Sequence, residues 1–202
     1  MVINEIVNQV KSKIAGRYAN AGNVFAHIAE VIEKAGNGNY LEIGVLNGGS
    51  ICAVGLLKRE LKQTGLCVGV DPFDGYYKAS TGMRTDKKTG LEVTIELAQS
   101  NVDKFALDNV QLIKAYSPFF NIGDMRFAVS FIDGDHSEEG AFSDWMKVKD
   151  ITDRFVIFHD YGRIEGVTKA CDRAALDSDW RVYRKEDFVF ILERNNAHPV
   201  TI

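Results

Sequence analysis

The sequence has few cysteines, and they form no metal-binding or redox pattern. Its 202 residues include only Cys52, Cys67 and Cys171, with no CxxC spacing. Two of the three lie within apolar runs, where a thiol usually behaves as a small hydrophobic side chain. The odd number and the spacing argue against a disulfide framework, so we expect reduced cysteines in a cytoplasmic compartment.

Long apolar runs and an excess of one charge are also absent. No stretch reaches the roughly 18 apolar residues of a membrane-spanning helix, and residues 1–14 mix charged and amide side chains through their apolar positions, unlike a secretory signal. Lys+Arg 24 against Asp+Glu 28 gives a formal net charge of −4. We therefore expect neither a nucleic acid nor a membrane as a partner.

What the sequence does contain is the composition of an ordinary globular domain. Hydrophobic residues make up 46% and charged residues 26%, which excludes disorder, collagen and coiled coil. A chain of this length buries about 70% of the surface that its unfolded state exposes. We expect one domain, or one domain with a small appendage.

Short apolar runs alternate with amphipathic segments along most of the chain. Two helices are predicted first, at about 3–15 and 23–35, with Gly36 as a stop for the second. The apolar runs then predict strands at 40–45, 66–71, 110–115, 127–133 and 155–159. The segments between them predict helices near 50–64, 94–106, 139–149 and 166–178. This alternation is typical of a parallel sheet covered by helices on both faces.

The C-terminal end departs from that pattern. Two apolar runs, 180–185 and 188–194, are separated only by Glu186 and Asp187, which is too short for a helical crossover, so the two strands must pair antiparallel. The sequence therefore predicts an α/β fold of the Rossmann-like, doubly wound type. We expect a mostly parallel seven-stranded sheet with a C-terminal antiparallel hairpin and short N-terminal helices.

Ligands of such sheets bind outside the carboxyl ends of the strands. The first strand is followed by the glycine-rich segment 42–50, EIGVLNGGS, which has neither the GxGxxG nor the GxxxxGK[ST] spacing. A pocket for a carboxylate or a nucleoside is thus favoured over a pyrophosphate site, with a plain tight turn as the alternative. The second strand ends at Asp71, where an acid can accept ribose hydroxyls or be a solvated loop acid.

The fourth and fifth strands each end in a carboxylate with an imidazole close by. The sequences are FIDGDH at 131–136 and FHDY at 158–161. Asp133, His159 and Asp160 could gather a divalent cation, and Asp135 or His136 could take a proton from a substrate. The alternative is that these acids only cap the helices that follow.

Together these segments resemble the class I S-adenosylmethionine-dependent methyltransferases. The resemblance is to the small-domain group of macrocin- and novobiocin-type sugar O-methyltransferases and cephalosporin-hydroxylase-like proteins. It is carried by LEIGVLNGGS (41–50), GVDPFDG (69–75), FIDGDHSEEGAFSDW (131–145), FHDY (158–161) and GVTKACD (166–172). It implies an N-terminal helical cap over residues 1–38 and an S-adenosylmethionine-binding methyltransferase domain over residues 39–202.

The resemblance also implies roles for particular residues. The cofactor-binding residues that it implies are Glu42, Gly44, Gly48, Ser50, Asp71, Tyr116, Ser117 and Asp133. The implied ligands of Mg²⁺ or Mn²⁺ are Asp133, His159 and Asp160, and the implied base is Asp135 or His136. Several metal-dependent members of the group have two acids at the positions of His159 and Asp160. Imidazole suits Mn²⁺, Fe²⁺ or Zn²⁺ better than Mg²⁺. Three interpretations therefore stay open: the metal differs, His159 is not a ligand, or no metal binds.

The function expected from these residues is O-methylation of a small sugar, polyol or phenol, with S-adenosylmethionine as the methyl donor. One alternative is an S-adenosylmethionine-binding pathway partner without methyl transfer. A nicotinamide-dependent oxidoreductase is disfavoured because GxGxxG is absent, and a hydrolase because GxSxG is absent. The polar segment 75–92, with Tyr76, Tyr77 and Arg84, is expected to be a lid or a surface loop. The N-terminal helices are expected to cap the pocket or to form a homodimer contact.

Overall fold

The computed structural model describes residues 2–18, 22–74, 85–86 and 88–195. Most of the predicted lid segment, including Tyr76, Tyr77 and Arg84, lies outside the described residues. None of the helices in the described part of the chain is long and apolar enough to cross a membrane.

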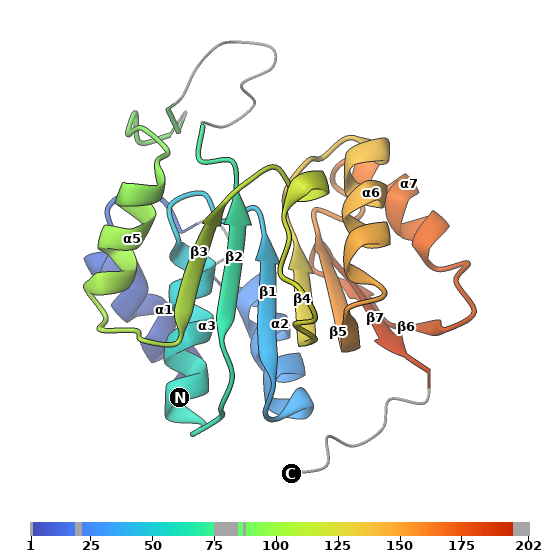
Figure 1. Ribbon diagram of the computed structural model, residues 1–202, viewed down its shortest axis with the longest axis horizontal. Coiled ribbons are helices and arrows are strands. Elements are labelled where there is room, and N and C mark those ends of the chain that lie inside the picture. The colour runs from blue at the N-terminus through green and yellow to red at the C-terminus, as the bar shows by residue number, and fades with distance from the viewer. Residues whose placement is uncertain (1, 19–21, 75–84, 87, 196–202) are drawn as a thin grey trace.

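A seven-stranded sheet runs through the centre of the molecule (Figure 1). Its strands, in the order β3-β2-β1-β4-β5-β7-β6, are β1 (Asn39–Ile43), β2 (Cys67–Asp71), β3 (Val110–Lys114), β4 (Phe127–Ile132), β5 (Thr152–His159), β6 (Trp180–Glu186) and β7 (Val189–Arg194). Neighbouring strands among β3, β2, β1, β4 and β5 pair in parallel, and β7 pairs antiparallel with both β5 and β6. The predicted fold class is confirmed.

Helices cover both faces of the sheet because its central strands are apolar on both sides. The helices are α1 (Val2–Lys13), α2 (Asn23–Ala35), α3 (Gly49–Glu60), α5 (Ile95–Asp103), α6 (Glu138–Val148) and α7 (Glu165–Ala174), with a short 3₁₀ helix, η1 (Ser117–Phe119). One core cluster joins α1, α2, α3 and α5 to the sheet, and a second joins α6 and α7 to its other face. All six residues of β4 are buried.

The three cysteines are free and buried in these two clusters. Burial raises the pKa of the Cys52 thiol and of the Cys67 thiol to about 12. The pKa of the Cys171 thiol is also raised by burial. All three thiols therefore stay protonated near neutral pH, as expected for hydrophobic core residues.

The N-terminal helices share the core of the sheet. Asn101 of α5, which is fully buried, fixes the α1–α2 connection to the loop after β1. Its side chain accepts a hydrogen bond from the Ala15 N–H and donates to the Ala15 and Asn47 carbonyl oxygens, each at 2.8 Å. The α1–α2 connection is thus held beside the loop at the carboxyl end of β1. The division into a cap and a main domain at residue 38 stays a prediction.

The terminal hairpin turns one residue later than predicted. The turn consists of Asp187 and Phe188, both with positive φ (51° and 67°), and β7 begins at Val189. Two consecutive residues with positive φ form the tight turn whose twist matches that of an antiparallel pair. The apolar side chain of Phe188 therefore lies in the turn, about half exposed, rather than in the strand.

Candidate functional site

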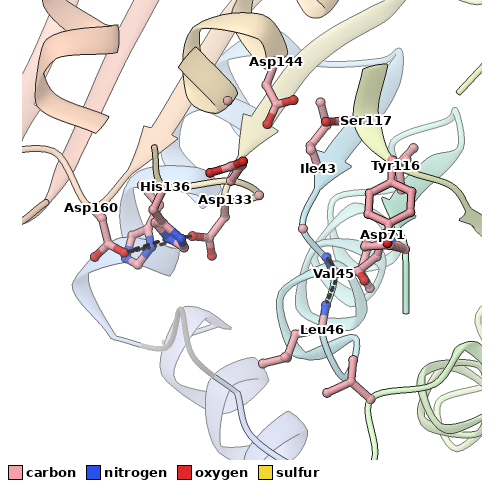
Figure 2. Close-up of a pocket in the computed structure, with 18 of the residues that line it drawn as sticks. Ile43, Val45, Leu46, Asp71, Tyr116, Ser117, Asp133, His136, Asp144 and Asp160 are labelled. Atoms are coloured by element: carbon pink, nitrogen blue, oxygen red, sulfur yellow. Dashed lines mark hydrogen bonds and ion pairs between the residues drawn. The ribbon is translucent and has the colours of Figure 1, made fainter. Parts of the chain in front are cut away.

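A cavity of about 1030 Å³ lies at the carboxyl ends of the parallel strands. From β1 the strand order continues to β2 and β3 on one side and to β4 and β5 on the other. The cavity lies beside this switch point, which is the usual ligand site of a doubly wound sheet. The predicted site residues that line it are Gly44, Ser50, Asp71, Tyr116, Ser117, Asp133, Asp135, His136, His159 and Asp160. Figure 2 shows Asp71 and Tyr116 on one side and Asp133, His136 and Asp160 on the other.

Neither Glu42 nor Gly48 is among the described residues that line the cavity. Glu42 is fully buried and accepts hydrogen bonds from the hydroxyls of Ser50 (2.5 Å) and Tyr40 (2.9 Å). It therefore orients Ser50, which does line the cavity at the start of α3. Gly48, with a φ of 84°, supplies the left-handed turn immediately before that helix. A direct contact of either residue with the cofactor stays a prediction.

The loop after β1 touches the end of β4. Gly44 has a φ of 90°, and a Cβ there would overlap the carbonyl oxygen of Asp133. The Asp133 N–H in turn donates to the Ile43 carbonyl oxygen at 2.8 Å. Only glycine at position 44 lets the two strand ends approach this closely.

The Asp71 carboxylate also organises this loop, which the sequence did not predict. Its Oδ2 accepts the backbone N–H groups of Val45 (2.8 Å) and Leu46 (2.9 Å), as Figure 2 shows, and Oδ1 accepts that of Phe73 (2.6 Å). A carboxylate has about four acceptor positions, so three are taken within the protein. Asp71 lines the cavity, but only about one acceptor position of its carboxylate remains. The predicted hydrogen bonds from two ribose hydroxyls would need two. Its ribose role stays a prediction.

Other polar side chains that were not predicted also line the cavity, among them Asp74, Arg17 and Asp144. Asp74 accepts a hydrogen bond from the Tyr116 hydroxyl at 2.5 Å, which links the ends of β2 and β3. The sequence could have indicated Asp74 through its place in the GVDPFDG segment after β2. Arg17 reaches the cavity from the α1–α2 connection, with Nε 3.7 Å from Oδ2 of Asp86. No sequence signal marked Arg17, because only the tertiary fold brings the N-terminal segment here.

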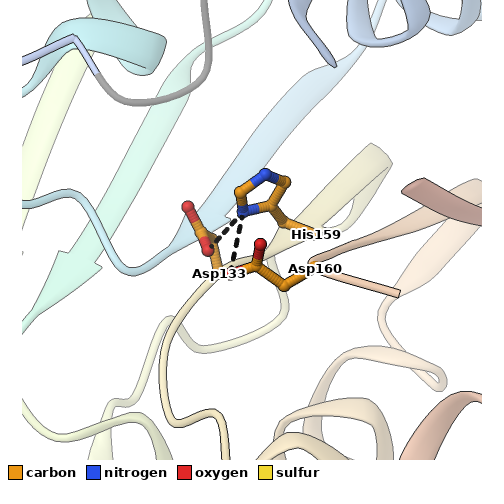
Figure 3. Close-up of side chains that lie close together, drawn as sticks. All are labelled: Asp133, His159 and Asp160. Carbon is orange, nitrogen blue, oxygen red and sulfur yellow. Dashed lines mark hydrogen bonds and ion pairs between the residues drawn. The ribbon is translucent and has the colours of Figure 1, made fainter. Parts of the chain in front are cut away.

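The acids and imidazoles at the tips of β4 and β5 form a compact cluster. Ligand atoms of Asp133, His159 and Asp160 all lie within 4.8 Å of one another (Figure 3). His159 Nδ1 is 2.9 Å from Asp133 Oδ1 and 3.6 Å from Asp160 Oδ2. His136 Nε2 is 3.1 Å from Asp160 Oδ2 and 3.5 Å from Asp133 Oδ1. Of the residues that the sequence singled out at these two strand ends, the structure thus brings together Asp133, His136, His159 and Asp160.

Charge is concentrated in this cluster. Burial by itself would lower the pKa of His136, but its contacts with the carboxylates of Asp133 and Asp160 prevail and raise the pKa to about 9. The pKa of His159 is raised in the same way: burial opposes the charged form, and Asp133 outweighs it. The carboxylates therefore stabilise positive charge beside them.

A divalent cation fits this donor set. Asp160 has a φ of 63°, unusual for a residue other than glycine, and such strain is often kept at functional sites. Its buried Oδ1 has no hydrogen-bond partner among the residues that the structure describes, and Arg163 Nη1 is 3.5 Å away. Two carboxylates and one imidazole form a mixed oxygen and nitrogen set that suits Mn²⁺ or Fe²⁺ well and Mg²⁺ less well.

Asp135 is exposed at the cavity and accepts the Ser137 N–H at 2.8 Å. Ser137 caps α6 by accepting the Gly140 N–H at 3.1 Å. Asp135 therefore supports the cap residue and does not itself cap the helix, which was the alternative interpretation of these acids. Both Asp135 and His136 remain candidates for the base.

The sequence matches a family model described as a methyltransferase domain over residues 41–161. The chain belongs to this methyltransferase family. The matched segment carries the loop after β1, Asp71, and the cluster at the tips of β4 and β5. Family and fold together identify a class I S-adenosylmethionine-dependent methyltransferase, as the resemblance predicted. No curated protein matches the chain significantly.

Solved structures of methyltransferases share the fold along almost the whole chain. The O-methyltransferase NovP has a TM-score of 0.70 at 20% identity, covering 96% of each chain. An O-methyltransferase from Bacillus cereus, solved with S-adenosylhomocysteine, has a TM-score of 0.61 at 16% identity, covering 96% of this chain and 90% of that one. The TDP-rhamnose 3'-O-methyltransferase CalS11 has 0.63 at 11%, covering 94% and 93%.

The buried Glu42 predicts a pH-dependent stability of this methyltransferase. Burial raises its pKa to about 8. Because the pKa is higher folded than unfolded, its stabilising effect is complete below about pH 4.5 and is lost as the pH rises toward about 8. Glu42→Gln stays neutral, so we expect nearly equal stability near pH 4 and a gain over wild type on the order of 5 kcal/mol near pH 9.

Urea unfolding of both proteins across this pH range measures the effect. Glu139→Gln, on an exposed side chain of α6, is the matched control and should show no such divergence. A difference between Glu42→Gln and wild type that does not change with pH would contradict the role of burial at Glu42.

Proposed function

We propose that this protein transfers the methyl group of S-adenosylmethionine to a hydroxyl oxygen of a small acceptor, a sugar, a polyol or a phenol. The observation that carries the proposal is the cluster of Asp133, His159 and Asp160, which opens into the same cavity as the glycine loop and Asp71. One end of the cavity suits a nucleoside and the other suits the activation of a hydroxyl group.

The reaction needs the acceptor oxygen to form a bond to the methyl carbon as the bond from that carbon to sulfur breaks. The electron pair passes to sulfur, and the hydroxyl proton passes to a base on the protein. Alignment of the two reactants supplies much of the rate in such a displacement. The loop fixed by Gly44 and Asp71 would hold the donor, and Asp135 or His136 would take the proton.

A divalent cation, Mg²⁺ or Mn²⁺, is the second part of the proposal, with Asp133, His159 and Asp160 as its ligands. When bound, it lowers the pKa of a coordinated hydroxyl, which an aliphatic alcohol needs near neutral pH. The buried Oδ1 of Asp160, which has no hydrogen-bond partner among the described residues, supports this assignment. The imidazole of His159 favours Mn²⁺ over Mg²⁺.

The acceptor class is supported by the chemistry of similar proteins and by the charge of this one. NovP is an O-methyltransferase, and CalS11 is a TDP-rhamnose 3'-O-methyltransferase. The net charge of −4 offers no attraction for nucleic acid. A homodimer contact through the N-terminal helices remains an expectation.

Transfer of a labelled methyl group from S-adenosylmethionine to a panel of sugars, polyols and phenols tests the proposal. We expect at least one acceptor to be methylated, and a chelator to lower the rate by about 100-fold or more until Mn²⁺ or Mg²⁺ is restored. An unchanged rate in chelator would contradict the metal assignment. Binding of the donor without transfer to any acceptor class would favour the alternative, a binding protein.

A further inference from the structure

Arg163 is a charged side chain at the cavity that the proposed reaction does not use. It lies in the connection from β5 to α7, lines the cavity, and has a side chain that is 64% exposed. Its guanidinium lies 3.5 Å (Nη1) from Asp160 Oδ1 and 5.8 Å from the centroid of the Phe188 ring. None of the described residues accepts a hydrogen bond from that guanidinium. Its fork of N–H donors is therefore available to a ligand.

The backbone that carries Arg163 is held in place on both sides. The N–H groups of Arg163 (3.1 Å) and Ile164 (3.0 Å) both donate to the carbonyl oxygen of Asp160. The Tyr161 N–H donates at 3.1 Å to the carbonyl oxygen of Phe188, in the turn of the terminal hairpin. Because these bonds fix the connection, Arg163 is presented to the cavity directly beside Asp160.

The position of the guanidinium limits how far its ligand group lies from the reaction. An anionic oxygen bound to Nη1 at about 2.8 Å would lie no more than about 6 Å from Asp160 Oδ1. In the proposed function, the acceptor hydroxyl is activated at the cluster of Asp133, His159 and Asp160. A group that binds Arg163 and the methylated hydroxyl are therefore only a few bonds apart in the acceptor.

The methyl donor bears a carboxylate of its own, and the cavity offers that group a different cation. Arg17 lines the cavity on the side of α3, since a Cβ at Gly49, the first residue of that helix, would lie 2.9 Å from the Cα of Tyr18. The connection with Arg163 follows β5, which is two strands from β1 and thus about 10 Å across the sheet. The donor carboxylate can therefore bind at Arg17 and leave Arg163 to the acceptor.

Resting on the proposed function, we propose that the acceptor is an acid and that Arg163 binds its anionic group. This group is a carboxylate or a phosphate a few bonds from the methylated hydroxyl, as in a sugar acid, a sugar phosphate or a hydroxybenzoate. A guanidinium pairs with either anion through two parallel N–H···O bonds. Arg163 is then a specificity-determining residue, which favours acidic acceptors over neutral ones of the same shape.

Matched pairs of acceptors measure this preference in kcat/KM for methyl transfer. The pairs are glucuronate and glucose, glucose 1-phosphate and glucose, and 3,4-dihydroxybenzoate and catechol, so that the carboxylate and phosphate arms show which anion is bound. We expect wild type to favour the acidic member of at least one pair by about tenfold or more, because a hydrogen-bonded charge pair is lost with the neutral member.

Arg163→Met keeps the long apolar stem of the side chain and removes its charge. We expect the preference for the acidic member to fall to near one or to reverse, because the anion then faces the carboxylates of Asp133 and Asp160 without a guanidinium. Arg181→Met is the matched control and should keep the wild-type preference. Arg181 is similarly exposed (66%) and also lies beside a carboxylate, that of Glu193, but it belongs to β6 and is not among the described residues that line the cavity.

Calorimetric binding of the same pairs to the complex with S-adenosylhomocysteine gives the preference without turnover. Equal affinity and equal kcat/KM within every pair for wild type would overturn this inference, while methylation of a neutral acceptor would leave the proposed function intact. Equal weakening of both members by Arg163→Met would also overturn it, because Arg163 would then serve Asp160 or the fold. Failure of folded wild type to bind S-adenosylhomocysteine would overturn the proposed function and, with it, this inference.

Discussion

Replacing Asp133 by asparagine is expected to lower the rate of methyl transfer by about three orders of magnitude or more. Both imidazoles of the cluster approach Asp133, with His159 Nδ1 at 2.9 Å and His136 Nε2 at 3.5 Å from its Oδ1. Asparagine keeps the size of the side chain but removes its charge and one acceptor oxygen. The variant would lose a cation ligand and the support of the neighbouring imidazoles.

The same variant should still bind S-adenosylhomocysteine within a few-fold of wild type, because the contact of Asp133 with the cofactor loop is made by its backbone. Initial rates with the best acceptor and calorimetric titration measure the two effects. Asp153→Asn, at the opposite end of β5 and paired with Arg126 on the surface, is the matched control. Unchanged turnover in Asp133→Asn would exclude Asp133 from the chemistry.

Replacing Gly44 by alanine is expected to destabilise the fold by roughly 3–5 kcal/mol, which is the second large effect. The new Cβ would overlap the backbone at Asp133, and neither strand end can move away without breaking the hydrogen bonds between Gly44 and Val70 and between Asp133 and Ile43. The positive φ of 90° adds strain for any side chain. If the variant folds, its β1 and β4 ends must separate, so cofactor affinity should fall with stability.

Urea unfolding of the two variants Gly44→Ala and Gly162→Ala distinguishes the effect of the overlap with Asp133 from the effect of backbone strain. Gly162 also has a positive φ, 74°, but a Cβ there would meet nothing within 4 Å. We expect Gly162→Ala to cost about 1–2 kcal/mol, the strain alone. Equal losses in the two variants would show that close contact between β1 and β4 is not what requires glycine at position 44.

Much of the fold could be predicted because it follows from local patterns. The apolar runs of the central strands are buried on both faces, and the two-residue separation at Glu186 and Asp187 left antiparallel pairing as the sole option. Helix ends were less predictable: α3, α5 and α7 end three or four residues earlier than their amphipathic patterns. Leu176, for example, continues the apolar spacing beyond α7 yet is 84% exposed.

The site could be predicted only where its residues stand at strand ends. Asp133, His136, His159 and Asp160 meet because parallel strands deliver their carboxyl ends to one edge of the sheet. Asp144 lies in the middle of α6, where a sequence pattern assigns no special position. Arg17 reaches the cavity through long-range packing, which no local spacing encodes.

The use of Asp71 shows a further limit of sequence patterns. Its place after β2 was evident, but its backbone partners Val45 and Leu46 lie more than twenty residues earlier in the chain. A carboxylate at a strand end can serve a ligand, a loop or both, and only the folded loop shows which of its oxygens are already engaged.

Calorimetric titration of the folded wild-type protein with S-adenosylhomocysteine, at two temperatures and with and without Mn²⁺ or Mg²⁺, shows whether the cavity holds the methyl donor. We expect binding at a single site with micromolar affinity, and a separate cation signal that Asp133→Asn removes. Absence of binding heat under all of these conditions would contradict the assignment of the cavity to the methyl donor.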